Sequence, residues 1–234
     1  MRNVLAVAIT LVLLPALALA RLEAGAGLSL AWPESDFKDH VEFAWGGGAR
    51  IGYGIGSVSP VVVTFFGDIN YLNYGRERRI EPFSTTIPDV VVDVVTDNYM
   101  FMVDPGLSIG LRYGPVRPYG EMSFGLTYIA TKTRIENHSL ASEPIAESTN
   151  FSDFTYNLGL GGGFKIPVWR KNIDVKLIEL SEALIDIKFC YLKGGEAEYL
   201  KKGSISRQSG QVRYETILSK TDLFQVRIGA SFVF

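Results

Sequence analysis

The feature that most constrains the fold is a regular alternation of apolar and polar residues, which is clearest at the C-terminus. A period of two residues is typical of a β-strand whose two faces meet different surroundings. In the last segment the apolar face carries Phe224, Val226, Ile228, Ala230, Phe232 and Phe234, and the polar face carries Gln225, Arg227, Gly229 and Ser231. Seven earlier segments alternate in the same way: Gly25–Trp32, Ala44–Gly54, Pro60–Tyr71, Phe101–Tyr113, Glu121–Tyr128, Phe154–Ile166 and Ile185–Tyr191.

The connections between these eight segments are of two kinds. Long polar stretches follow the odd-numbered segments: Pro33–Phe43, Leu72–Met100, Thr131–Asp153 and Lys193–Asp222. Short turns, Ile55–Ser59 and Gly114–Val116, follow the second and fourth, and Pro167–Glu182 is a longer connection after the sixth. Long loops at one end and short turns at the other are the layout of an outer-membrane barrel. The sequence therefore predicts an all-β fold, an eight-stranded antiparallel up-and-down transmembrane β-barrel with both termini on the periplasmic side.

A barrel of ten strands is the alternative. Asn172–Leu180 and Gln211–Ser219 also alternate, although Glu179 breaks the pattern in the first of them. We favour eight strands, with Gln211–Ser219 extending the last hairpin above the membrane.

The direction of the apolar face separates a membrane barrel from a soluble one, whose apolar face would point inward to a ligand cavity. The polar face is rich in glycine and serine, whereas the apolar face carries bulky residues such as Phe124, Phe164, Phe189 and Phe232. The interior of an eight-stranded barrel is narrow, so it favours small side chains. Aromatic residues also gather at both ends of the segments, as interfacial girdles do. We therefore expect the apolar face to point outward, into lipid.

The N-terminus has the features of a secretory signal peptide. A basic residue, Arg2, precedes an apolar run from Val4 to Leu14, and Ala18-Leu19-Ala20 is an A-x-A cleavage site. An N-terminal membrane anchor is the alternative, but the run is short for a spanning helix. We expect residues 1–20 to be removed after Ala20 and residues 21–234 to form the barrel domain.

The last strand resembles the C-terminal signal of bacterial outer-membrane barrels. Gly229, Phe232 and the terminal Phe234 match that pattern, whereas Ile228 departs from its usual polar residue. The resemblance implies recognition by the barrel assembly machinery and insertion into the bacterial outer membrane, among outer-membrane lipid and lipopolysaccharide. As a whole, the chain resembles the small OmpA-like and OmpX-like barrels. We expect a monomer, and a net charge of −2 gives no reason to expect nucleic acid as a partner.

If the polar face points inward, the lumen contains a nearly balanced set of charges. Charges in so narrow an interior must pair with each other or meet water. One hypothesis is a structural, salt-bridged and largely closed lumen; the other is a small-solute, porin-like channel. We favour the first because the bore of eight strands is tight. The candidate residues are Arg50, Asp68, Asp104, Arg112, Arg117, Glu121, Lys165, Asp186, Lys188 and Arg227.

Residues suited to catalysis are scarce. The only histidines are His40 and His138, and the single cysteine, Cys190, is expected to fill space. A lipid A-modifying enzyme would have to use His138 with Ser139, or His40 with Asp36 or Asp39, and neither set has a third partner on a strand. We assign no catalytic residue and expect no cofactor and no metal.

Basic residues in the predicted extracellular loops offer a third hypothesis, which is binding of lipopolysaccharide phosphates. A solvated loop face is the simpler interpretation, and we favour it. The residues concerned are Arg76, Arg78, Arg79, Lys132, Arg134, Lys201 and Lys202.

Overall fold

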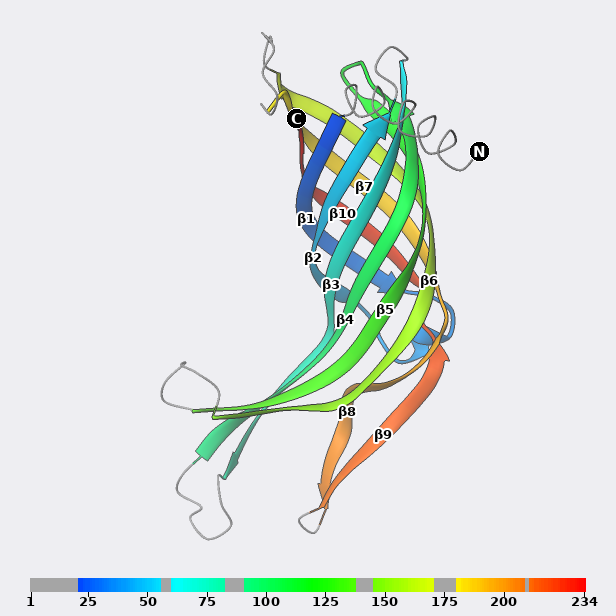
Figure 1. The fold of residues 1–234 in the computed structure, drawn as a ribbon. Coiled ribbons are helices and arrows are strands. Elements are labelled where there is room, and N and C mark those ends of the chain that lie inside the picture. Colours follow the sequence, from blue (N-terminus) through cyan, green and yellow to red (C-terminus); the bar gives the residue numbers. More distant parts are fainter. Residues whose placement is uncertain (1–20, 56–59, 83–90, 138–144, 171–179, 209–210) are drawn as a thin grey trace, which may run out of the picture.

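Eight antiparallel strands close into a barrel in the computed structural model, which describes residues 21–55, 60–82, 91–137, 145–170, 180–208 and 211–234. Around the barrel the order is β1-β10-β7-β6-β5-β4-β3-β2 (Figure 1). The predicted eight-stranded, all-β architecture is confirmed. The bounds are β1 (Arg21–Pro33), β2 (Ala44–Ile55), β3 (Val61–Pro82), β4 (Val91–Leu111), β5 (Arg117–Asn137), β6 (Ala146–Arg170), β7 (Glu182–Gly194) and β10 (Leu223–Val233).

Two strands and a short helix lie outside this ring. The strands β8 (Glu196–Gln208) and β9 (Gln211–Lys220) pair only with each other, as a two-stranded sheet. The 3₁₀ helix η1 (Ser35–Asp39) lies in the connection between β1 and β2. The segment Gln211–Ser219 is therefore part of a protruding hairpin, as the eight-stranded interpretation predicts. Of the other ambiguous segment, Asn172–Leu180, all but Leu180 falls outside the described residues.

The four strands β3 to β6 continue far beyond the barrel wall, and here the prediction of long polar loops is wrong. Strands β3 and β4 stay paired as far as Pro82 and Val91, and β5 and β6 as far as Ile135 and Ala146. We call the part beyond the barrel the extension: residues 75–82, 91–98, 131–137 and 146–151. In Figure 1 it curves away from the barrel axis.

Two irregularities in strand pairing explain why alternation did not reveal the extension. The β3–β4 register shifts between Asn73 and Gly75, and the β5–β6 register shifts between Thr131 and Lys132. A β-bulge adds one residue to one strand, bends it and reverses the face on which later side chains lie. The apolar face of the barrel segment therefore does not continue in phase into the extension.

The barrel has two distinct ends. At one end, which we call the short-turn end, the two terminal strands pair and Phe234 donates its N–H to the Leu22 carbonyl at 2.9 Å. The other, the extension end, carries the extension, η1 and the β8–β9 hairpin (Figure 1). Within the described residues no helix is long and apolar enough to cross a membrane.

The outer wall of the barrel is apolar, as predicted. Leu28 is 72% exposed and Leu160 69% exposed, whereas the inward Asp68 is 1% exposed. An apolar surface of this extent is stable against lipid rather than water. Near the extension end a row of rings runs around the wall: Tyr71 lies 5.4 Å from Tyr99, Tyr99 6.3 Å from Tyr128, and Tyr128 4.7 Å from Phe154 between ring centroids. This row is the girdle expected at a membrane interface.

Candidate functional site: a filled lumen

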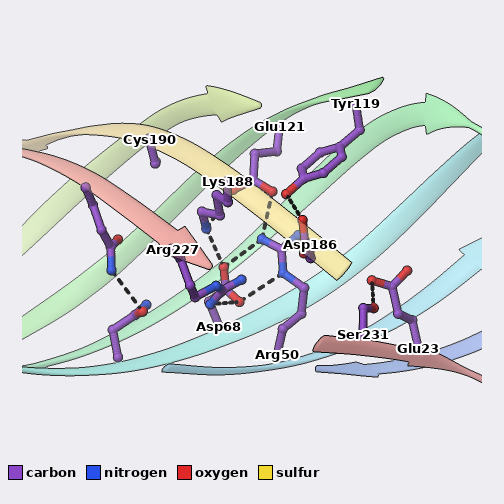
Figure 2. A network of polar contacts seen from close by, with 12 residues as sticks. Glu23, Arg50, Asp68, Tyr119, Glu121, Asp186, Lys188, Cys190, Arg227 and Ser231 are labelled. Carbon is purple, nitrogen blue, oxygen red and sulfur yellow. Dashed lines mark hydrogen bonds and ion pairs between the residues drawn. The ribbon is translucent and has the colours of Figure 1, made fainter. Parts of the chain in front are cut away.

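The centre of the lumen is organised around one carboxylate, Asp68 on β3, which binds three cations from three other strands (Figure 2). Arg50 on β2 donates through Nε and Nη2 to both carboxylate oxygens, at 2.9 and 2.7 Å. Lys188 on β7 donates to Oδ2 at 2.7 Å, and Arg227 on β10 donates to Oδ1 at 3.0 Å. Asp68 thus ties together opposite parts of the barrel wall.

A second carboxylate, Glu121 on β5, completes this central network. It accepts from Arg50 Nη2 at 2.7 Å and lies 2.7 Å from Lys188 Nζ. The Arg50 guanidinium also sits 3.9 Å above the centre of the Phe66 ring, a cation–π contact. All five members, Arg50, Asp68, Glu121, Lys188 and Arg227, are buried.

Space for the network comes from glycine on the inward face. A Cβ built on Gly48 would lie 2.4 Å from Asn70 Oδ1 and 3.2 Å from Arg227 Nη1. A side chain there would therefore displace the Asn70 amide and crowd the guanidinium of Arg227. The small inward residues noted in the sequence are what allow long charged side chains to cross so narrow a bore.

Hydrogen bonds from uncharged donors to further carboxylates surround the central network. Tyr119 donates its hydroxyl to Asp186 at 2.8 Å, as Figure 2 shows. Asn157 donates to Asp104 at 2.8 Å, so this predicted lumen charge has an amide as its partner. Cys190 is buried in the same region, as a space-filling role requires.

A second group of charges closes the short-turn end, and sequence reasoning found only part of it. Glu182 pairs with Arg21 at 2.9 Å, with Arg117 at 2.7 Å and with Arg170 at 3.0 Å. Of these four, the sequence analysis names only Arg117. Arg21 precedes the first alternating segment, and Arg170 and Glu182 lie in the connection after the sixth.

Two more of the predicted lumen charges, Lys165 and Arg112, lie at the short-turn end. Lys165 pairs with Glu23, which also accepts from the Ser231 hydroxyl at 2.8 Å. Arg112 lies in the turn after β4, where it lines the mouth and its guanidinium is 5.4 Å from the Tyr113 ring centre. Glu23 was missed because it precedes the first alternating segment.

The extension end is closed by aromatic side chains that the sequence did not predict. Phe37 of η1, Tyr74 of β3 and Tyr199 of β8 pack edge to face, with Phe37–Tyr199 centroids 5.2 Å apart and Phe37–Tyr74 centroids 6.0 Å apart. We call these three the aromatic plug. They rest on inward apolar residues of the barrel, among them Leu72, Met100, Ile129 and Leu192. Burial raises the pKa of Tyr199, whose hydroxyl is hydrogen-bonded to Ser219 Oγ at 2.9 Å.

One buried aspartate, Asp222, anchors the first loop to the wall. Ser35 Oγ donates to its carboxylate at 2.8 Å, Gly194 N–H at 2.9 Å and Tyr191 OH at 3.3 Å. Its own carbonyl accepts from the Glu34 N–H at 2.9 Å. The anchor holds η1, and so Phe37, over the mouth.

Replacing Asp222 with alanine is expected to loosen the first loop, because buried donors that lose their acceptor cost about 1–3 kcal/mol. Trypsin should then cleave after the exposed Lys38 about ten times faster than in the wild type. Asp36→Ala, an exposed neighbour in η1, serves as the control and should leave the rate unchanged. Equal cleavage of both variants would show that Asp222 does not hold the loop.

Little open volume remains inside the described barrel. A cavity of about 10 Å³ lies beside Arg50 and Arg227, and one of about 50 Å³ lies at the short-turn mouth beside Glu23 and Arg112. One water molecule needs roughly 10–15 Å³ of such volume. The lumen therefore has room for scattered waters between its charged layers.

The remaining candidate residues are dispersed. His40 has its ring 6.5 Å from that of Tyr199, and His138 with Ser139 lies outside the described residues. The described part of the chain contains no group of three His, Cys, Asp or Glu side chains suited to a metal ion.

The basic loop residues are mostly paired with acids of the extension. Arg76 lies 3.5 Å from Asp97, Arg78 lies 2.6 Å from Asp93, and Arg134 pairs with Asp97. Further pairs are Arg79 with Glu77 and Lys132 with Glu147, whereas Lys201 and Lys202 are exposed on β8.

A closed ring of eight tilted strands, apolar outside and charged inside, defines a small transmembrane β-barrel with a filled lumen. A family model gives the same class: that of the outer membrane protein beta-barrel domain matches residues 4–184. The chain belongs to this family, and its place is the bacterial outer membrane. The short-turn end is then periplasmic and the extension end extracellular, as such barrels are oriented.

Several solved structures are similar to the chain. Ail, the attachment invasion locus protein of Yersinia pestis, solved with the heparin analogue sucrose octasulfate, is 14% identical with a TM-score of 0.44, over 92% of this chain and 99% of that one. Neisserial surface protein A is 13% identical with a TM-score of 0.39, over 91% and 95% of the two chains. No curated protein matches the chain.

Proposed function

We propose that this protein is a non-conducting, non-enzymatic barrel that serves as a rigid outer-membrane base for its extracellular extension and hairpin. The observation that carries the proposal is the closure of the lumen at three levels. The Glu182 cluster fills the periplasmic end, the Asp68 network crosses the middle, and the aromatic plug covers the extracellular end. What remains available for interaction is the part outside the membrane.

The porin-like alternative requires a continuous water path. The central network obstructs that path, because Arg50 is bonded both to Asp68 and to Glu121 on the far wall. The enzymatic alternative needs a positioned nucleophile or base. The ring of His40 lies beside Tyr199 of the aromatic plug, so we assign His40 a packing role and no catalytic role.

The proposal includes how the chain reaches its place. The signal peptide is removed between Ala20 and Arg21, after the Ala18-x-Ala20 motif, and a Gram-negative barrel assembly machinery recognises Gly229, Phe232 and Phe234. Phe232 and Phe234 are each 39% exposed on the outer wall, which leaves both rings accessible in the last strand. Outer-membrane lipid and lipopolysaccharide surround the folded monomer.

Planar-bilayer recording tests the closed lumen directly. The purified wild-type protein is expected to give no steady single-channel conductance, because charged side chains hold the narrow bore closed. A known porin inserted in the same bilayers is the positive control. Steady channels whose conductance changes on Glu121→Gln or Arg112→Gln substitution would overturn the proposal in favour of a small-solute channel.

A further inference from the structure

We propose that a hollow on the outer wall binds one phosphorylated, acylated glycolipid of the lipid A type from the outer leaflet. The hollow has a volume of about 590 Å³ and lies where β7 leaves the barrel. The residues used in the argument are Leu126, Phe154, Tyr156, Lys193, Glu196 and Lys220. The proposal rests on the membrane location of the chain and not on what the extension binds.

The hollow exists because the barrel wall loses a strand. Pairing between β6 and β7 ends at Asn157 and Gly194. The chain then turns at Gly195, which donates its N–H to the Tyr156 carbonyl at 2.8 Å, and β8 runs inward to the buried Tyr199. A Cβ on Gly195 would lie 2.8 Å from the Tyr156 ring, so the turn is pressed against that ring. Past this turn β8 lies beside β6 without a ladder between them, and Glu198 donates its N–H to the Asp153 carboxylate at 2.8 Å. The change from a paired strand to an unpaired one leaves a step in the wall.

The aromatic girdle sets the level of this step relative to the membrane. Leu126, Phe154 and Tyr156 form its floor and are 59%, 69% and 51% exposed. The Phe154 ring lies 4.7 Å from that of Tyr128, which belongs to the row of rings at the extracellular interface. The floor of the hollow therefore lies at the membrane depth where lipid acyl chains meet lipid headgroups. The molecules available to fill a lateral hollow at that depth are lipids of the outer leaflet.

The rim of the hollow selects the headgroup. Lys193 and Lys220 are both exposed on it, against one carboxylate, Glu196. An apolar floor below a net positive rim fits a molecule with an acyl chain and a phosphate, because ammonium groups bind phosphate oxygens through charge-assisted hydrogen bonds. In contrast, Arg76 and Arg78 of the extension already lie in ion pairs with Asp97 and Asp93. The phosphate site is therefore on the flank and not on the extension.

Native mass spectrometry of the mature chain in phosphatidylcholine nanodiscs that contain bisphosphorylated lipid A tests the site. The wild type should retain one lipid A molecule. Lys193→Glu/Lys220→Glu should weaken retention by at least roughly thirtyfold, because loss of two lysine contacts at a membrane surface costs that much and the new carboxylates also repel phosphate. Lys201→Glu/Lys202→Glu makes the same charge change on β8, away from the hollow, and should retain lipid A as the wild type does.

Each other result overturns the proposal. Absence of retained lipid A, or equal losses in both double variants, would show that no specific site exists. If added phosphatidylglycerol displaces the retained lipid A as strongly as added lipid A does, the surface binds anionic lipids in general and is not a glycolipid site. If the glutamate variant does not fold, Lys193→Gln/Lys220→Gln replaces it, and unchanged retention by that variant also rejects the site. None of these readouts depends on whether the lumen conducts.

Discussion

Replacing Asp68 with alanine is expected to lower the free energy of unfolding by about 3–5 kcal/mol, because a buried ion pair loses one partner. Arg50, Lys188 and Arg227 would all lose the carboxylate that they share in the centre of the barrel. Glu121 would remain within reach of only two of them. Urea unfolding in detergent micelles, followed by tryptophan fluorescence and by the gel shift of the folded barrel, measures the loss.

Two further variants make this result specific. Asp186→Ala removes a buried carboxylate whose donor, among the residues described, is the Tyr119 hydroxyl, and should cost about 1–3 kcal/mol. Arg227→Leu in the Asp68→Ala background removes one orphaned cation. The loss of unfolding free energy in the double variant should therefore be about 1–3 kcal/mol smaller than the sum of the losses in the two single variants. A loss for Asp68→Ala no larger than for Asp186→Ala would contradict the central role given to Asp68.

The membrane-spanning part of the fold could be predicted from the sequence because two different surroundings act on alternate residues. Lipid requires apolar side chains on one face, and a narrow lumen requires small or charged ones on the other. Gln225 and Arg227 face inward for this reason and alternate with the outward Phe224, Val226 and Ile228. In the extension no lipid acts on one face, and the register shifts at Asn73/Gly75 and Thr131/Lys132 break the alternation, so the sequence predicts loops there instead of strands.

The five charges of the central network could be named in advance, but their pairing could not. Arg50 and Asp68 are direct neighbours in the β2–β3 register. Arg227 reaches the same Asp68 although 159 residues separate the two in sequence. That contact depends on strand order and stagger around the barrel, which alternation alone does not supply. Tyr199 was missed because its inward position depends on the fold of the hairpin.

Replacing Phe37 with alanine is expected to open the extracellular end of the protein without unfolding the barrel. Phe37 is fully buried, and truncation of such a ring costs about 3–5 kcal/mol. Its contacts with Tyr74 and Tyr199 hold η1 and β8 together over the mouth. Amide hydrogen exchange in β8 should accelerate by roughly 10²- to 4 × 10³-fold, because local opening then costs about 3–5 kcal/mol less. Phe43→Ala, a 39% exposed ring on the same loop, is the matched control and should change exchange little.

Conductance of the Phe37→Ala variant should nevertheless stay absent, because the plug and the central network close the lumen independently. The plug is made by η1, β3 and β8. The network is made by side chains of β2, β3, β5, β7 and β10, nearer the middle of the barrel. Loss of the aromatic plug leaves Arg50 bonded to both Asp68 and Glu121 across the bore. Channels in this single variant would show that the ion pairs do not exclude ions and that the plug alone keeps the barrel closed. Unchanged exchange in β8 would show instead that Tyr199 is held in place without Phe37.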